Sequence, residues 1–389
     1  MKQVQLFGDG IHDDGPAIQA MLDSGESLVY LPTPKTCYLI GQTLLIGSRQ
    51  ELRLDAYTRM VLKDNADCCM LENKHQTDGD EYITINGGIW DMNHRNQSPN
   101  PQHFPDKKTG LTRREKIAAA GYRKDSGVFF PAYCGHCFRF NRVTHFMFRN
   151  VTIENPVVYG VQIANADHFT FENVTFDYTE GSPKLWNMDG IHVEGGCKNG
   201  YIHNLHGACH DDTVAITSDD GLYGPIENIT VDGIYAERSH SAVRLLSSER
   251  PVRNIHITNV FGTYYVYAVT LSNYCYFENK KGRYEHISID HVHASFSEGT
   301  VDVPGNYYPL IAIDRELEIT DLSIDHLYRR EMQCTTPTVG VEKNTHIESL
   351  TLTDIYQSNE VGGSMALLSN AGTIDRVYKE RLMGKDKSI

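Results

Sequence analysis

One short pattern of apolar and polar positions recurs along most of the chain. It reads apolar, any residue, apolar, any residue, a small or polar residue, then apolar, as at 146–151. Further copies begin at Ile83, Phe169, Ile229, Ile255, Ile287, Leu322 and Leu350, and a degraded copy begins at Ile202. From Phe148 onward the second apolar position advances by 23 to 35 residues per copy. Alternation with a period of two predicts a β-strand with one buried face in each copy.

The residue before the last apolar position of each copy predicts a tight bend. Asn150, Asn173, Gly233 and Asn259 occupy this position, and both Asn and Gly tolerate a positive φ. No stretch inside these copies has the periodicity of a helix. Short strands separated by bends stack as a parallel β-helix, with about 4.8 Å between neighbouring strands. The predicted fold class is therefore all-β, a single-stranded parallel β-helix of roughly ten coils.

A second strand of each repeat can be aligned in the same way, and it carries most of the polar residues of interest. They fall into three aligned sets: Asp189, Asp212, Ser241 and Tyr267 at the head of the strand, Asp211 and His240 one residue earlier, and His192 and Arg244 three residues later. Aligned residues of a solenoid stack on adjacent coils. We therefore expect the carboxylates and both histidines to share one outer face.

The two ends and one interruption complete the expected organisation. Residues 1–50 are expected to form an N-terminal cap and the first strands, with a short capping helix within 13–22. Residues 91–125 are rich in Asn, Pro, Lys and Arg and break the repeat, which predicts a long inserted loop with a short helix near 112–120. A solenoid core grows along one axis, so we expect residues 1–389 to form a single domain.

Charge and composition narrow the class of protein. The 389 residues carry a formal net charge of −14, which argues against a nucleic-acid partner because phosphate binding needs a basic surface. No apolar run approaches the roughly 20 residues that cross a bilayer, so no membrane partner is expected. The first residues lack the apolar stretch of a secretory signal, which favours the cytoplasm and leaves a mature secreted or periplasmic form open. Nine cysteines, an odd number, favour reduced thiols.

The aligned carboxylates point to one kind of chemistry. Cleavage of a glycosidic bond commonly uses two carboxyl groups, one as an acid and one as a base or nucleophile. Asp189, Asp211 and Asp212 supply three candidates, and solvated bend residues are the alternative interpretation. The segment Cys134-Gly-His136-Cys137 lacks the second pair of ligands that a zinc site needs. We therefore expect no metal and no cofactor.

Three short motifs about one repeat apart carry a family resemblance. They are Asn187-Met188-Asp189, His210-Asp211-Asp212 and Ser239-His240-Ser241. Through them the chain resembles glycoside hydrolase family 28, the polygalacturonase family, within the pectin-lyase-like right-handed parallel β-helix proteins. The corresponding motifs of that family are Asn-Thr-Asp, Asp-Asp and Gly-His-Gly. The resemblance implies a right-handed β-helix and a glycosidase that acts on a poly- or oligosaccharide, and it leaves the oligomeric state open.

The resemblance also implies roles for the aligned residues. Asp211 would protonate the leaving oxygen, while Asp189 and Asp212 would hold and deprotonate the attacking water. His240 would tune Asp211 or orient the sugar. Hydrolysis would then proceed with inversion, although the residues by themselves do not assign these roles.

Four further residues are expected to bind the sugar. They are Asn187, His192, Arg244 and Tyr267, and an exposed surface position is the alternative for His192. The family's Arg-Ile-Lys motif falls at 265–272, where neither cation is present, and Arg244 is the candidate replacement for its arginine. The sequence leaves open whether the substrate must carry a uronate, which linkage is cut, and whether the action is endo or exo.

Two other functions remain open at this point. A β-helix lyase or epimerase would use His240, Arg244 or a tyrosine as its base. A non-catalytic β-helix would bind carbohydrate without cleaving it.

Overall fold

The alternating segments of the sequence form strands that stack in register. The computed structural model describes residues 5–106, 109–178, 187–274, 278–299 and 307–386. The chain divides into two compact units, Met1–His192 (unit 1) and Val193–Ile389 (unit 2), and each is described by itself. The expectation that residues 1–389 form a single domain stays a prediction.

In its described residues, unit 1 contains short strands, two α-helices and two 3-10 helices. Its elements are α1 (Gly15–Leu22), β1 (Leu28–Leu31), β2 (Tyr38–Ile40), β3 (Leu44–Ile46), β4 (Glu51–Leu54), β5 (Arg59–Leu62), β6 (Leu71–Asn73), β7 (Asp80–Glu81), β8 (Thr84–Asn86), β9 (Ile89–Asp91), η1 (His94–Asn96), α2 (Arg113–Ala119), η2 (Lys124–Ser126), β10 (Phe138–Asn141), β11 (Val143–Arg149), β12 (Thr152–Glu154), β13 (Val161–Ala164) and β14 (Asp167–Asp177). The following strand, β15 (Ile191–Glu194), contains the division between the units.

All strand pairs of unit 1 described by the structure are parallel. One ladder runs β3–β6–β10–β13, and two others, β1–β4–β8–β11 and β2–β5–β9–β12, both end on β14. Phe146 pairs with Phe169 and Phe148 with Phe171, as the repeat predicts. All four rings are buried, so stacked aromatic side chains fill this part of the core.

The capping helix and the inserted segment both form. Helix α1 buries Ile18 and Leu22, and the carboxylate of Asp13 accepts a hydrogen bond from the backbone of Gly15 at 2.9 Å. Within the insertion, α2 begins after Thr112, whose side chain and that of Glu115 each bond the other's backbone N–H. This reciprocal capping satisfies two orphan donors and explains why a helix starts there.

Unit 2 contains only strands among its described elements. They are β16 (Lys198–His206), β17 (Asp212–Thr217), β18 (Ile226–Ser239), β19 (Ser241–Leu246), β20 (Pro251–Tyr264), β21 (Val269–Ser272), β22 (Gly282–Phe296), β23 (Ile311–Ile313), β24 (Leu317–Glu331), β25 (Val339–Val341), β26 (His346–Asn359), β27 (Leu368–Asn370) and β28 (Thr373–Asp386).

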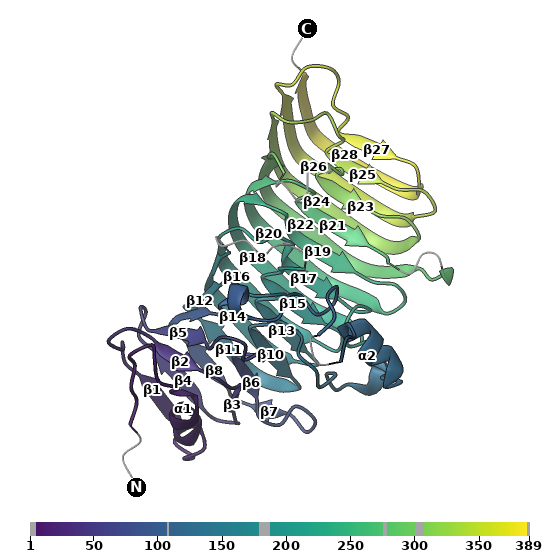
Figure 1. The fold of residues 1–389 in the computed structure, drawn as a ribbon. Coiled ribbons are helices and arrows are strands. Elements are labelled where there is room, and N and C mark those ends of the chain that lie inside the picture. The colour runs from purple at the N-terminus through teal and green to yellow at the C-terminus, as the bar shows by residue number, and fades with distance from the viewer. Residues whose placement is uncertain (1–4, 107–108, 179–186, 275–277, 300–306, 387–389) are drawn as a thin grey trace. The chain divides into compact units, whose positions relative to one another are not determined.

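These strands form two parallel sheets, with one strand of each sheet per coil (Figure 1). The long-strand sheet runs β16–β18–β20–β22–β24–β26–β28. The short-strand sheet runs β17–β19–β21–β23–β25–β27. In the long-strand sheet Ile229 pairs with Ile255 and Ile255 with Ile287, which confirms the predicted register. Buried aliphatic side chains thus lie directly above one another along the core.

The predicted bends have the predicted backbone conformation. Asn150, Asn173 and Asn259 have φ of 57°, 54° and 57°, and Gly233 has φ of 87°. In three later coils the same position holds His291, His326 and Asp354, again with positive φ. The prediction of an all-β parallel β-helix with a short N-terminal helix is confirmed. No helix in the described part of the chain is both long and apolar enough to span a membrane.

Candidate active site

The first strands of the short-strand sheet position two carboxylates and a histidine. Asp212 begins β17 and pairs with Ser241, which begins β19, as the sequence alignment predicts. Asp211 and His240 stand one residue before these strands. His240 Nδ1 lies 3.8 Å from Asp211 Oδ1, and the His240 backbone N–H donates to the carbonyl of Cys209. The predicted grouping of Asp211, Asp212 and His240 is therefore present within unit 2.

Asp212 is buried and held by two hydroxyl donors and one cation from neighbouring positions. The hydroxyl of Ser241 donates to Asp212 Oδ1 at 2.5 Å, and that of Tyr267 donates to the same oxygen at 3.0 Å. The other oxygen, Oδ2, lies 2.6 Å from Arg244 Nε in an ion pair. A buried charge needs such partners, because an unpaired one is strongly destabilising.

A short hydrogen-bond chain links the histidine to the same carboxylate. His240 Nδ1 lies 3.0 Å from Ser241 Oγ. Because the single hydroxyl proton of Ser241 goes to Asp212, its oxygen accepts the bond from His240 Nδ1–H. The His240 ring also stands edge-on to Tyr265 and Tyr267, with centroid separations of 5.4 and 6.1 Å. These contacts fix the orientation of the imidazole beside Asp211.

Arg244 occupies the centre of the network rather than a solvent-facing position. Its side chain is 8% exposed and pairs with Asp212, while its Nη2 lies 3.8 Å from Asp220 Oδ2. Its Nη1 donates to the hydroxyl of Tyr274, and the guanidinium lies 5.2 Å from the centre of that ring. Burial acts to lower the pKa of Arg244, but Tyr274 and Asp212 raise it well above its usual value. The guanidinium therefore stays charged.

The tyrosines of this network stay protonated. Burial, followed by the nearby Asp212 carboxylate, raises the pKa of Tyr267 well above its ordinary value. Burial likewise raises the pKa of Tyr265, and Asp211 adds to the effect. Tyr267 is thus a hydroxyl donor to Asp212.

A cavity of about 490 Å³ opens beside this network within unit 2. Its lining includes His240, Arg244, Tyr267, Tyr274, Tyr308 and Arg315. Cations, aromatic rings and hydroxyl groups around one cavity suit a sugar, whose ring faces stack on aromatics and whose hydroxyls need polar partners.

Part of the cavity comes from the following coils, whose residues are not among the candidates predicted from the sequence. Asp314 and Arg315 follow β23, and Glu342 follows β25. Burial raises the pKa of Asp314 above its usual value, although the backbone N–H of Arg315 donates to it at 2.8 Å. The sequence signal for this part of the cavity is the short apolar strand that contains Ala312. Ala312 pairs with Thr270 and so continues the Ala215–Arg244–Thr270 column by one coil.

Unit 1 brings together the remaining candidates, Asn187, Asp189 and His192. Asp189 is 1% exposed, and its Oδ2 lies 2.7 Å from His192 Nδ1. The fully buried His192 ring stacks on Tyr159 with a centroid separation of 4.1 Å. Its burial excludes the exposed surface position that the sequence left open. Asn187 Oδ1 lies 3.0 Å from His103 Nε2, so the inserted segment reaches this candidate residue.

The candidates thus form two groups, each within one unit. Asp211, Asp212, His240, Arg244 and Tyr267 share a network in unit 2. Asn187, Asp189 and His192 lie close to one another in unit 1. That the two groups act together stays a prediction, which rests on the sequence repeat.

The unit 2 network leaves little reason for a cation at the carboxylates. Asp211, Asp212 and His240 have potential ligand atoms within 4.8 Å of one another. Arg244 already supplies positive charge to Asp212 at 2.6 Å, so a divalent ion would have to compete with a buried guanidinium.

Comparison with known proteins identifies the family. The family model described as "Glycosyl hydrolases family 28" matches residues 132–375, which is more than half of the chain. This match confirms the resemblance to glycoside hydrolase family 28 that the three motifs indicated. No curated protein sequence matches the chain.

Solved structures show the same fold at low sequence identity. The endo-xylogalacturonan hydrolase of Aspergillus tubingensis is 12% identical with a TM-score of 0.63, over 95% of this chain and 98% of that one. The hyperthermoactive exopolygalacturonase of Thermotoga maritima is 18% identical with a TM-score of 0.60, over 96% and 89%. The Streptococcus pneumoniae surface adhesin PfbA is 14% identical with a TM-score of 0.54, over 98% and 90%. These similarities support the right-handed β-helix and, at such identities, the fold alone.

Proposed function

Because the chain belongs to glycosyl hydrolases family 28, we propose that it hydrolyses O-glycosidic bonds in pectic or related plant polysaccharides and oligosaccharides, with inversion of the anomeric carbon. The observation that carries the proposal is the grouping of Asp211 and Asp212 with His240, which itself lines a cavity together with tyrosines and arginines.

The environments of Asp211 and Asp212 support different roles for the two carboxyl groups. Asp211 is partly exposed, with 23% of its side chain accessible, and lies beside His240 and Tyr265. That position suits a group that exchanges a proton with a bound sugar. Asp212 is held in place by Ser241, Tyr267 and Arg244, which suits a carboxylate that orients and deprotonates water.

In the proposed reaction, Asp189, His192 and Asn187 of unit 1 have supporting roles. Asp189 would share the activation of the attacking water with Asp212, as the family motif implies. His192 bonds Asp189 and is itself packed on Tyr159, so it would position that carboxylate and not contact the sugar. Asn187 keeps the role of a substrate contact.

The cations that line the cavity bear on whether the bound sugar is acidic or neutral. Arg244 is engaged by Asp212, which leaves it poorly placed to recognise a second carboxylate. Arg315 also lines the cavity; its Nε lies 3.8 Å from Asp314 Oδ1, a longer contact than that of Arg244 with Asp212, and 39% of its side chain is accessible. A sugar that carries one carboxylate would meet Arg315, whereas a neutral sugar would depend on the tyrosines.

A panel of pectic and other plant glycans tests the reaction. We expect reducing ends to increase without formation of an unsaturated uronate, with products whose initial anomeric configuration is inverted. Unsaturated products would establish a lyase, and a change of sugar configuration without cleavage would establish an epimerase. Arg315→Ala should weaken the use of acidic oligosaccharides more than that of neutral ones.

A non-catalytic carbohydrate-binding β-helix is the second candidate. The tight pairing of Arg244 with Asp212 favours it, because this contact restrains a carboxylate that hydrolysis would employ. The structural similarity to an adhesin is compatible with the same role. Binding of a glycan without release of sugar from any member of the panel would decide for this candidate.

A further inference from the structure

Two adjacent coils of the long-strand sheet carry the same four residues. Ser-Ile-Asp-His occurs at 288–291 on β22 and again at 323–326 on β24. The strands pair in register, with Ile289 opposite Ile324 and Asp290 opposite Asp325. The histidines occupy the bend position that Asn150, Asn173 and Asn259 hold in other coils, at φ of 50° and 47°. The solenoid therefore stacks one imidazole directly on another.

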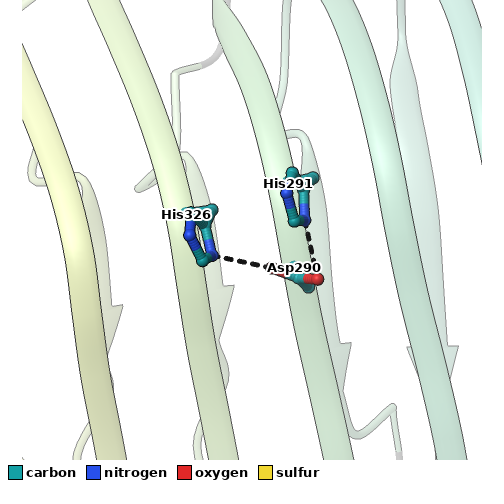
Figure 2. A group of neighbouring side chains, drawn as sticks. All are labelled: Asp290, His291 and His326. Atoms are coloured by element: carbon teal, nitrogen blue, oxygen red, sulfur yellow. Dashed lines mark ion pairs between the residues drawn. The ribbon is translucent and has the colours of Figure 1, made fainter.

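The carboxylate of Asp290 forms ion pairs with both imidazoles (Figure 2). The rings of His291 and His326 are 4.6 Å apart at their centres and within 9° of parallel. His291 Nδ1 lies 2.7 Å from Asp290 Oδ2, and His326 Nδ1 lies 3.4 Å from Asp290 Oδ1. Potential ligand atoms of all three residues lie within 4.8 Å of one another.

The centre of this cluster holds an unsatisfied oxygen. Asp290 Oδ1 is inaccessible to solvent and makes no hydrogen bond to any described residue. Its ion-pair contact with His326 Nδ1, at 3.4 Å, is too long and poorly aligned to count as a hydrogen bond. A buried polar atom without a hydrogen bond is unusual in a folded protein and marks a place where an ion or another group can bind. About half of each histidine side chain is exposed, so a small ion has access to the cluster.

The surrounding charges favour a cation. Asp325 Oδ2 lies 3.2 Å from His326 Nδ1, which adds a second carboxylate on the same side. Asp354 lies on the next coil, 3.8 Å from His326 Nε2, but it is engaged by Arg381, which lowers the pKa of this carboxyl. Asp290 and Asp325 have no arginine or lysine among the ion pairs described for them. The cluster itself therefore carries excess negative charge.

We propose that Asp290, His291 and His326 form a binding site for a late first-row divalent cation, of which Zn²⁺ is the representative. Two imidazoles and a carboxylate are the ligand set that such ions prefer, whereas Mg²⁺ and Ca²⁺ favour oxygen alone. The site differs from the cysteine segment considered in the sequence analysis, and its residues do not line the 490 Å³ cavity.

Binding requires one local adjustment. The lone pairs of two parallel rings run side by side, so at least one imidazole must rotate about its Cβ–Cγ bond to converge on a shared ion. The half-exposed side chains leave room for this rotation, while the backbone stays fixed by the pairing of β22 with β24. The bound ion would join two successive coils and stabilise the folded state in proportion to its occupancy.

Titration of the full chain, stripped of metal, with Zn²⁺ alone tests the proposal. We expect saturable binding at a 1:1 ratio, measured by calorimetry, and a rise of the melting temperature with Zn²⁺ concentration. His291→Asn and His326→Asn should each lower the affinity at least about tenfold, since even the loss of an outer partner of a metal ligand has an effect of that size. Asparagine preserves the positive-φ bend, because it occupies the same position in other coils.

His286→Asn is the matched control. This residue also lies on β22 at a positive φ of 57°, but its imidazole pairs with a single carboxylate, that of Asp321. The control should bind Zn²⁺ like the unaltered chain. Asp290→Asn provides a second route, because it removes the shared carboxylate and keeps both bends. Equal Zn²⁺ affinity in the unaltered chain, His326→Asn and Asp290→Asn would overturn the proposal, as would a Co²⁺ spectrum dominated by thiolate ligands.

Discussion

Strand β20 of the long-strand sheet buries other kinds of side chain than β17 and β19 of the short-strand sheet. In the long-strand sheet, β20 alternates buried aliphatic residues such as Ile255 and Ile257 with accessible polar ones. In the short-strand sheet, β17 and β19 are buried at every position, and the buried residues include Asp212 and Arg244. Strand β20 thus repeats a simple apolar ladder, while β17 and β19 place charges inside the protein. Further along the long-strand sheet, β24 also buries an ion pair, that of Arg329 with Glu331.

This difference shows how one solenoid can combine an apolar scaffold with a buried network of charges. Each aliphatic side chain that the long-strand sheet buries contributes about 1.5–3 kcal/mol relative to exposure. The buried charges of Asp212 and Arg244 are stabilised by each other and by the hydroxyl groups around them, so each depends on specific partners. Apolar positions should therefore tolerate conservative exchange, whereas the charged positions should not.

The largest effect on stability is expected from Arg244→Ala. It would leave Asp212 buried beside two hydroxyl groups and without a cation, which should lower the free energy of unfolding by about 4 kcal/mol. Urea denaturation measures the change. Arg253→Ala in the long-strand sheet is the control, because Arg253 is 36% exposed and its ion pairs with Glu227 and Glu285 should contribute less than about 1 kcal/mol. Similar losses in the two variants would contradict the comparison.

A smaller loss is expected within the apolar ladder. Ile257→Ala would leave a cavity at a fully buried position between Val231 and Ile289 and should lower the free energy of unfolding by about 3 kcal/mol. Ile257→Val should lower it by about 1 kcal/mol. Thermal and urea unfolding measure both variants. A loss for Ile257→Val as large as for Ile257→Ala would show that the ladder is not simply apolar packing.

The smallest effect on the free energy of unfolding is expected at the bends. Asn259→Ala places alanine, which has a Cβ atom but no polar side chain, at a φ of 57°. It also removes the hydrogen bond that the Asn259 side chain donates to Asp232 Oδ1. The loss should be about 1 kcal/mol. Asn259→Gly removes the same hydrogen bond but accepts the positive φ, so it should be the more stable variant. Equal stability of the two variants would show that φ is not what selects Asn at the bends.

The sequence predicted what depends on periodicity. Three features follow from residues that recur at the same position of each repeat. They are the pairing of Ile229 with Ile255, the bend at Asn259 and the pairing of Asp212 with Ser241. Such features are local and repeat in each coil, so one copy supports the others.

The sequence could not predict which groups the long side chains contact. Arg244 aligns with Ala215 and Thr270, but the alignment does not say whether its guanidinium reaches Asp212, Asp220 or a substrate. Arg315 lies beyond a connection of irregular length, so its place beside the cavity is not visible in the repeat. His192 looked accessible because its strand was taken to have one outer face, yet the structure buries it against Tyr159.

The most direct test of the account is the initial rate of glycan hydrolysis by Asp211→Asn. The side chain of Asp211 is partly exposed and lies outside the pairing of Asp212 with Arg244, so the variant should melt within a few degrees of the unaltered chain. We expect release of reducing sugar from the best substrate of the panel to fall by about 10²–10⁴-fold, the usual contribution of a proton-transferring group. An unchanged rate in a folded Asp211→Asn protein would contradict the assignment of this carboxyl group as the acid.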